Sequence, residues 1–167
     1  QPKSETLDNP TMLDLMIKNQ IDQRNKDFSK IMEDFVDMPE DSTPDNQAYI
    51  KAYRKTYTSI NHFLNEYDKP KSSFEFIKHG EIIKYDQLSM GEKQILLLML
   101  MVGNTKQEPC IFFMDEPDLS MHIDWKEILV KELHELNPNM QIILSTHAPS
   151  VITGWHDRVK EVSQLIK

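Results

Sequence analysis

Two carboxylates stand directly after a short apolar run, in the stretch Cys110–Met114 followed by Asp115 and Glu116. An unbroken apolar run of this length predicts a strand buried in a parallel sheet, and ligands collect at the carboxyl ends of such strands. There, Asp115 would be a rigidly held ligand for Mg²⁺, and Glu116 could act as general base on an attacking water. Phosphoryl transfer to water needs both a placed metal ion and an activated water. The alternative is an acidic turn with Pro117.

A hydroxyl and a glycine open a second segment, residues 88–94, which read Leu-Ser-Met-Gly-Glu-Lys-Gln. If a helix begins after Ser89, its free N–H groups form an anion site, and Gly91 lets a phosphate approach closely. A simpler explanation is that Ser89 caps the helix and Glu92, three residues later, completes a capping box. The two interpretations are compatible.

A histidine, His147, follows the apolar residues 141–144 and the pair Ser145-Thr146. At the carboxyl end of a strand beside Asp115, its imidazole could donate a hydrogen bond to a phosphate oxygen. A single histidine is more often an ordinary core or surface residue. The remaining histidines match no zinc spacing; they are His62, His79, His122, His134 and His156.

Together, and in this order, the three segments resemble the ABC-type ATPase superfamily over about residues 74–155. Residues 88–94 are similar to its signature motif, 110–116 to its Walker B strand, 118–124 to its D-loop, and His147 to its switch histidine. The resemblance implies ATP and Mg²⁺, with heads that dimerise and sandwich two ATP molecules. It assigns metal binding to Asp115, catalysis to Glu116 and His147, and contacts with nucleotide to Ser89, Gly91, Glu92, Gln94, Asp118 and Ser120.

Details of two motifs point to one branch of that superfamily. Transporter ATPases have a signature ending Gly-Gly-Gln, whereas residues 91–94 read Gly-Glu-Lys-Gln. The D-loop Glu-Pro-x-Leu-Ser-x-His and the later Ser-Thr-His-Ala-Pro-Ser are similar to the SMC/RecF-like heads of OLD and Septu-type anti-phage ATPases. This resemblance implies a DNA-associated head in defence or repair. Because only 20 residues follow His147, it also implies a nuclease on a separate chain. Met90 departs from the small residue usual at its position.

One motif of these ATPases does not occur in the sequence. There is no Gly-x-x-x-x-Gly-Lys-Ser/Thr phosphate loop, and the glycines are Gly80, Gly91, Gly103 and Gly154. We therefore expect the chain to be the C-terminal portion of an ATPase whose Walker A lobe lies elsewhere. On its own it should be inactive.

The apolar pattern predicts two helices before the ATPase lobe. Leucine, methionine, isoleucine and phenylalanine recur at three- and four-residue spacing over residues 13–36, after a helix start at Asn9-Pro10. A proline-rich stretch, residues 39–45, ends this helix, and a tyrosine-bearing helix follows to residue 67. We expect an antiparallel helical pair over 10–70, after a terminal or linker segment 1–9. It either packs on the core or projects as an arm that docks a partner.

The remaining residues, 71–167, form the predicted α/β lobe with a mostly parallel sheet. Residues 74–85 predict a β-hairpin with a turn at His79-Gly80, and 91–102 predict a helix. Strands at 111–114 and 141–144, joined by a helix at 125–136, predict a βαβ unit. The pattern leaves residues 157–167 open between strand and helix.

Composition narrows the function classes. The formal net charge of −8 argues against a surface that binds nucleic acid all over. A single cysteine, Cys110, excludes an internal disulfide and predicts a buried thiol in a reducing cytoplasm. The longest apolar run, Ile95–Val102, is too short to span a bilayer, so we expect no membrane-spanning segment and no membrane partner. Two alternatives remain: a non-hydrolysing scaffold that binds a partner through the helical pair, and a transporter subunit, which the signature and D-loop disfavour.

Overall fold

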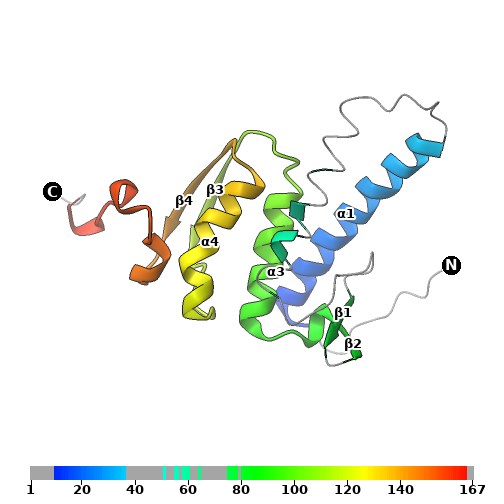
Figure 1. The fold of residues 1–167 in the computed structure, drawn as a ribbon, viewed down its shortest axis with the longest axis horizontal. Helices are drawn as coiled ribbons and strands as arrows, with labels where there is room; N and C mark the ends of the chain where they lie inside the picture. Colours follow the sequence, from blue (N-terminus) through cyan, green and yellow to red (C-terminus); the bar gives the residue numbers. More distant parts are fainter. Residues whose placement is uncertain are drawn as a thin grey trace.

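The computed structural model describes residues 10–36, 51, 55–56, 58–60, 64, 75–78 and 80–164. Along these residues the helices and strands follow in the order α1 (Met12–Val36), β1 (Glu75–Lys78), β2 (Glu81–Lys84), α3 (Met90–Gly103), β3 (Cys110–Asp115), α4 (Ile123–Leu136) and β4 (Met140–Ser145). Figure 1 shows this arrangement.

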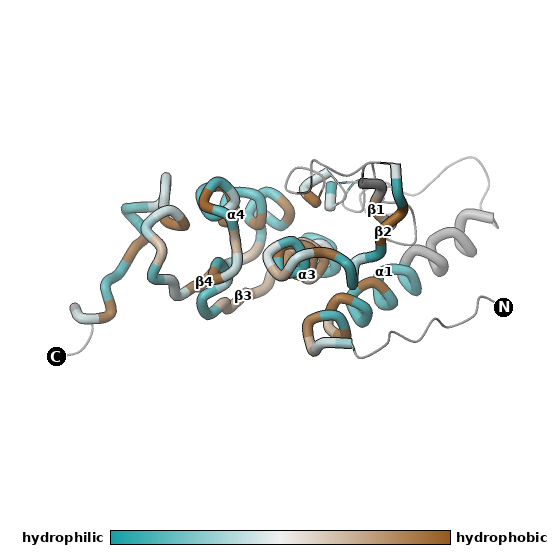
Figure 2. The backbone as a smooth tube through the Cα atoms, turned by 90° about the horizontal axis from the view of Figure 1, so that it is seen from below, coloured by the Kyte–Doolittle hydropathy of each residue, from teal (hydrophilic) through white to brown (hydrophobic). Residues whose placement is uncertain are grey.

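Helix α3 lies at the centre of the molecule. Figures 1 and 2 both place it between α1 on one side and α4 with the strands β3 and β4 on the other. Residues Ile95–Leu100 and Val102 are all buried. A helix that is apolar on every side, as this one is, is typically covered on every side by other elements. Its bounds confirm the helix predicted at 91–102. Among the described residues, no helix combines the length and apolarity needed to cross a membrane.

Strands β3 and β4 are parallel, and α4 connects them. Their register pairs Cys110 with Met140 at one end and Asp115 with Ser145 at the other. The βαβ unit and the α/β class with parallel strands are therefore confirmed. Because Asp115 and Ser145 are paired, the residues that follow the two strands emerge side by side.

The two faces of this strand pair differ in burial. One face, which includes Met114, packs against the core. The other leaves Ile111, Phe113 and Ile143 exposed at 56%, 70% and 42%. The prediction that β3 is buried on both faces is wrong for the described structure. Alternate side chains of a strand point to opposite faces, and only the face with Met114 is covered. Cys110, predicted to be buried, is half-buried.

Strands β1 and β2 form the predicted antiparallel hairpin. Lys78 pairs with Glu81 across the turn, and Gly80 has a φ of +83°, a left-handed conformation that glycine adopts without strain. Phe76 is fully buried and anchors the hairpin to the core. The hairpin leads directly into the segment that precedes α3.

Helix α1 begins at Met12, three residues after the predicted cap Asn9. The Thr11 hydroxyl accepts a hydrogen bond from the Asp14 backbone N–H at 3.2 Å, and the Asp14 carboxylate accepts one from the Thr11 backbone N–H at 3.0 Å. This reciprocal pair is a capping box, which explains the start at Met12. Met16, which the sequence pattern places on the apolar stripe of this helix, is 43% exposed, because the buried side of the helix is centred on Ile17.

Two ion pairs show that α1 and α3 run in the same direction. Asp14, near the start of α1, lies 2.7 Å from the Lys93 ammonium near the start of α3. Farther along, Asp27 lies 3.0 Å from Lys106, just beyond the end of α3. Most of the second predicted helix, and its pairing with α1, lies outside the described residues. Its described Ile60 is buried in the core.

The Asp14–Lys93 pair makes stability depend on pH. Burial raises the pKa of Asp14, but hydrogen bonds from Lys93 and Thr11 together lower it more, so the pKa lies below its ordinary value. A carboxylate with a lowered folded-state pKa stabilises the fold above the unfolded-state pKa, near 4, and this contribution is lost as pH falls further. We expect the free energy of unfolding to fall less between pH 5 and pH 3 in Asp14→Asn than in wild type.

Urea unfolding at several pH values measures this difference. Asp22→Asn is the matched control, because Asp22 pairs with Lys18 on the same helix while both side chains are about half exposed. The control should follow the wild-type curve. Equal pH slopes for wild type and Asp14→Asn would contradict the assignment.

Asn137, at the end of α4, connects the loop between α4 and β4 to the loop between α3 and β3. It is fully buried; its amide nitrogen donates to the Thr105 hydroxyl at 2.8 Å and the Glu108 carbonyl at 2.9 Å, and its amide oxygen accepts from the Asn139 backbone N–H at 3.0 Å. Asn137→Ala should lower the free energy of unfolding by about 1–3 kcal/mol, because the part-buried hydrogen bonds of a fully buried side chain are lost. Urea denaturation measures the loss. The exposed Asn139, changed to Ala, should cost less than about 0.5 kcal/mol; equal costs would contradict this account.

Short 3-10 turns, and neither strand nor long helix, follow β4 in the described chain. They cover Pro149–Ile152, His156–Arg158 and Val162–Gln164. This answers the open question for the described part of residues 157–167.

Candidate active site

Glu116 turns the chain away from the end of β3. Its φ is +45°, a left-handed conformation that costs a residue other than glycine on the order of 1–3 kcal/mol. The Glu116 backbone N–H donates to the Ser145 carbonyl at 3.0 Å, which extends the pairing of β3 with β4 and holds this conformation. Strained backbone of this kind is often found at functional sites.

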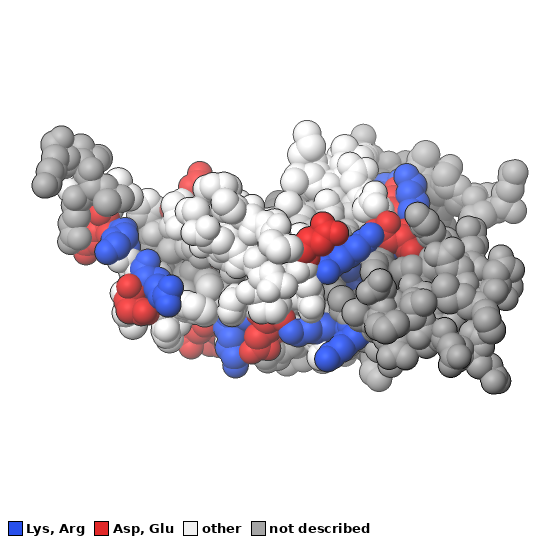
Figure 3. All heavy atoms as spheres, turned by 90° about the horizontal axis from the view of Figure 1, so that it is seen from above, with Lys and Arg blue, Asp and Glu red and all other residues white. Residues whose placement is uncertain are grey.

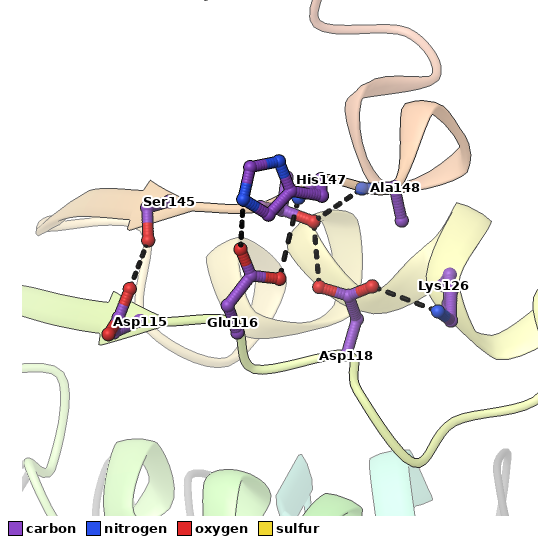
Figure 4. Close-up of polar contacts among 8 residues, drawn as sticks. Asp115, Glu116, Asp118, Lys126, Ser145, His147 and Ala148 are labelled. Carbon is purple, nitrogen blue, oxygen red and sulfur yellow. Dashed lines mark hydrogen bonds and ion pairs between the residues drawn. The ribbon is translucent and has the colours of Figure 1, made fainter. Parts of the chain in front are cut away.

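The structure brings Glu116 and His147 into contact, as Figure 4 shows. One carboxylate oxygen, Oε1, lies 3.5 Å from His147 Nε2, and the other accepts a hydrogen bond from the His147 backbone N–H at 3.4 Å. The Glu116 side chain is 25% exposed and the His147 side chain 98% exposed. A proton acceptor and an imidazole thus lie next to each other with one side open to a ligand.

Asp115 lies at the carboxyl end of β3, on the open face of the strand pair. It accepts a hydrogen bond from the hydroxyl of Ser145, its partner in the sheet (Figure 4). Mg²⁺ prefers oxygen ligands and is usually held by one or two carboxylates together with substrate phosphates. Within the described ranges, no group of three acidic, histidine or cysteine side chains could hold a metal alone. Asp115 and Ser145 therefore fit a Mg²⁺ carried mainly by phosphates.

Ser89 caps helix α3, as the sequence suggested. The Ser89 hydroxyl accepts from the Glu92 backbone N–H at 3.4 Å, and the Glu92 carboxylate accepts from the Ser89 backbone N–H at 2.7 Å. The capping box is thus confirmed, and Ser89 is exposed at the positive end of a 14-residue helix. Contacts of Ser89, Glu92 and the half-buried Gln94 with nucleotide stay predictions.

Gly91 joins the signature segment to the D-loop. A methyl group added at Gly91 would lie 2.3 Å from the Ser120 carbonyl oxygen, so no larger residue fits without moving backbone. Ser120 itself is exposed. The start of α3 and the turn after β3 are therefore in close contact at this point.

Asp118 is buried, at 2% exposure, and both of its carboxylate oxygens have protein partners. Oδ1 accepts from the Thr146 hydroxyl at 2.7 Å, and Oδ2 lies 2.9 Å from the Lys126 ammonium (Figure 4). Its predicted contact with nucleotide stays a prediction, and these partners favour a different role. Sequence reasoning did not identify Thr146 or Lys126, because nothing in their spacing signals a link across two loops.

Comparisons with known proteins identify a family and two similar ATPases. Residues 4–153 match the family described as "AAA domain, putative AbiEii toxin, Type IV TA system". The chain is 30% identical over 139 residues to the retron Vc95 probable ATPase of Vibrio cholerae serotype O1 biovar El Tor, which covers 72% of this chain and 27% of that protein. It is 26% identical over 169 residues to the retron Ec83 probable ATPase of Escherichia coli, with coverage of 89% and 31%.

A solved structure of an SMC head bound to the C-terminal winged-helix domain of ScpA is also similar. Its TM-score is 0.49 at 16% identity, over 60% of this chain and 35% of that one.

The fold is an α/β lobe with a pair of parallel strands, and the family match covers most of the chain. The chain belongs to the AAA family with putative AbiEii toxins. It spans about three-tenths of the length of the retron relatives. The matched names are AAA and retron ATPases, so the finer placement beside Septu and OLD proteins stays a prediction.

Proposed function

We propose that this chain is the catalytic C-terminal lobe of an ATPase that hydrolyses ATP to ADP and phosphate. One observation supports it above all: Asp115, Glu116 and His147 meet at the carboxyl ends of two adjacent parallel strands. The names of the relatives support ATPase activity at the level of the family.

In the proposed reaction, Glu116 accepts a proton from water while the water oxygen attacks the γ-phosphorus. The bond from that phosphorus to the bridging oxygen breaks, and ADP leaves. His147 turns from Glu116 to donate a hydrogen bond to a γ-phosphate oxygen. Mg²⁺, held through Asp115, would supply charge neutralisation on the phosphates.

The phosphate loop is proposed to come from a segment outside this chain. The open face of β3 and β4 supports this, because parallel strands are normally covered on both faces and here Ile111, Phe113 and Ile143 are exposed. That face also carries Asp115 at its edge. A Walker A lobe seated there would bring phosphates to the metal ligand.

A second copy of the chain is the proposed partner of the signature segment. Ser89 at the positive helix end would contact the ATP held by the other copy. Exposed apolar side chains, Met90 at 56% and Leu119 at 75%, flank the Gly91–Ser120 contact and are available for such an interface.

The biological setting we propose is anti-phage defence or DNA repair in the cytoplasm, in the SMC/RecF-like branch. The retron names of the relatives support the defence setting. A nuclease on a separate chain and association with DNA remain part of the proposal. In the described part of the face in Figure 3, acidic and basic side chains are interspersed, which offers DNA no single basic surface there.

By itself the 167-residue chain should bind Mg-ATP weakly, because it provides no phosphate loop. We expect no measurable heat at micromolar concentrations in titration calorimetry. A clear micromolar binding curve would contradict the proposed division of the site between two segments.

ATP hydrolysis by the protein that includes the phosphate loop tests the proposed function, with and without double-stranded DNA. Glu116→Gln serves as the blank. Stimulation by DNA supports the SMC/RecF-like placement, and turnover indifferent to DNA points to a protein or nucleotide trigger. Turnover no higher than the blank would overturn the proposal and favour a non-hydrolysing scaffold.

A further inference from the structure

Three charged or polar side chains form a link between the two turns that carry Glu116 and His147. We call Asp118, Lys126 and Thr146 the Asp118 bridge. Asp118 lies in the turn after β3, Lys126 in the first turns of α4, and Thr146 in the turn after β4. Asp118 is 2% exposed, and its two oxygens contact Thr146 at 2.7 Å and Lys126 at 2.9 Å.

The bridge reaches the backbone next to the candidate histidine. While the Thr146 hydroxyl donates to Asp118, it accepts a hydrogen bond from the Ala148 backbone N–H at 3.0 Å. Thr146 and Ala148 are the two neighbours of His147, so both sides of the histidine are held (Figure 4). At the other end of the bridge, Asp118 lies two residues after Glu116.

The direct contacts between Glu116 and His147 are long. Their side chains lie 3.5 Å apart, the backbone hydrogen bond is 3.4 Å, and the imidazole is almost fully exposed. The contacts that Asp118 makes in the bridge are shorter, part-buried and charge-assisted, and such hydrogen bonds are about twice as strong as neutral ones. The position of His147 relative to Glu116 is therefore set more firmly by the bridge than by the pair.

We propose that Asp118 is a positioning residue, which acts through Thr146 to hold His147 in place opposite Glu116. This rests on the proposed ATP hydrolysis. It gives Asp118 a role other than contact with nucleotide. Because a misplacement of about 1 Å at a reacting group can cost on the order of 100-fold in rate, a link of this kind affects turnover more than substrate binding.

Thr146→Val is the sharpest test, because valine has the shape of threonine and makes neither hydrogen bond. In the protein that includes the phosphate loop, we expect kcat to fall about 10- to 100-fold, with KM for ATP within about 3-fold of wild type. Thr146→Ser keeps the hydroxyl and should stay within about 3-fold of wild-type kcat. Thr105→Val is the matched structural control, since the Thr105 hydroxyl also makes part-buried hydrogen bonds, to Val102 and Asn137.

A second pair of variants tests the cation in the bridge. Lys126→Met should lower kcat in the same way as Thr146→Val. Lys131→Met, on the same helix, removes only an exposed pair with Glu135 and should leave kcat unchanged. In the double variant Asp118→Asn with Thr146→Val, the losses should be less than additive, because both changes break one link.

Amide hydrogen exchange at residues 146–148 measures local opening of this turn independently of activity. Thr146→Val should exchange faster there than wild type, and Thr146→Ser should not. Wild-type kcat in Thr146→Val would overturn the positioning role, as would a loss confined to KM or an equal loss of kcat in Thr105→Val. If the wild-type protein shows no turnover that depends on Glu116, the proposed function fails and the positioning role fails with it.

Discussion

Glu116→Gln is expected to lower ATP turnover by about 10²- to 10⁴-fold, the range that a general base contributes. Glutamine keeps the size and one acceptor oxygen of the side chain but cannot take a proton from water. Mg-ATP binding should persist, since Asp115 is unchanged. Phosphate release under saturating Mg-ATP measures the effect.

Glu127→Gln is the matched control for that change. Glu127 is an exposed acid on α4 of the same lobe, so its substitution removes the same charge from a side chain outside the proposed site. Its turnover should equal wild type. Near-normal turnover in Glu116→Gln would show that another group is the base.

The Glu116→Gln protein should also remain associated as a dimer in the presence of Mg-ATP. If ATP is sandwiched between two copies, blocked hydrolysis keeps the nucleotide in place and the copies together. Sedimentation velocity with Mg-ATP and with Mg-ADP measures this. A monomer under both conditions would contradict the proposed sandwich.

Gly91→Ala should lower turnover on the order of 100-fold through a change of one methyl group. The added Cβ would lie 2.3 Å from the Ser120 carbonyl oxygen and 3.3 Å from its carbonyl carbon, both backbone atoms that cannot rotate away. The start of α3 must then move away from the D-loop, which displaces Ser89 from its place at the proposed composite site. The free energy of unfolding should fall by about 1–3 kcal/mol as well.

Gly103→Ala separates the effect on turnover from the effect on stability. Gly103 lies on the same helix, and its added Cβ would lie 2.4 Å from the Thr56 hydroxyl, far from the strand ends. We expect a similar loss of stability, measured by urea unfolding, with turnover per folded molecule close to wild type. Equal turnover in the two alanine variants would contradict the role of the Gly91 contact.

Local patterns were sufficient to predict the elements that carry the site. The apolar runs that become β3 and β4, and the capping residues of α3, determine structure through neighbours in the sequence. The closeness of Asp115, Glu116 and His147 could also be predicted, because these residues follow two adjacent parallel strands whose carboxyl ends lie side by side. These features needed no knowledge of distant contacts.

Tertiary contacts decided what the sequence did not reveal. The run Cys110–Met114 is apolar throughout, so its pattern could not show that Ile111 and Phe113 lie on an open face. The bridge from Asp118 to Thr146 spans 28 residues of sequence, and only the fold brings them together. In α1, the charged Asp14 is buried because Lys93 pairs with it from another helix.

We propose that each ATP is hydrolysed at an interface between two copies of the chain. One copy contributes Glu116 and the other contributes the signature segment. Mixing the inactive Glu116→Gln and Gly91→Ala proteins tests it most directly. Random pairing leaves one intact site in each mixed dimer, so turnover should recover to about one quarter of wild type. Turnover in the mixture that stays at the average of the two separate variants would contradict the claim.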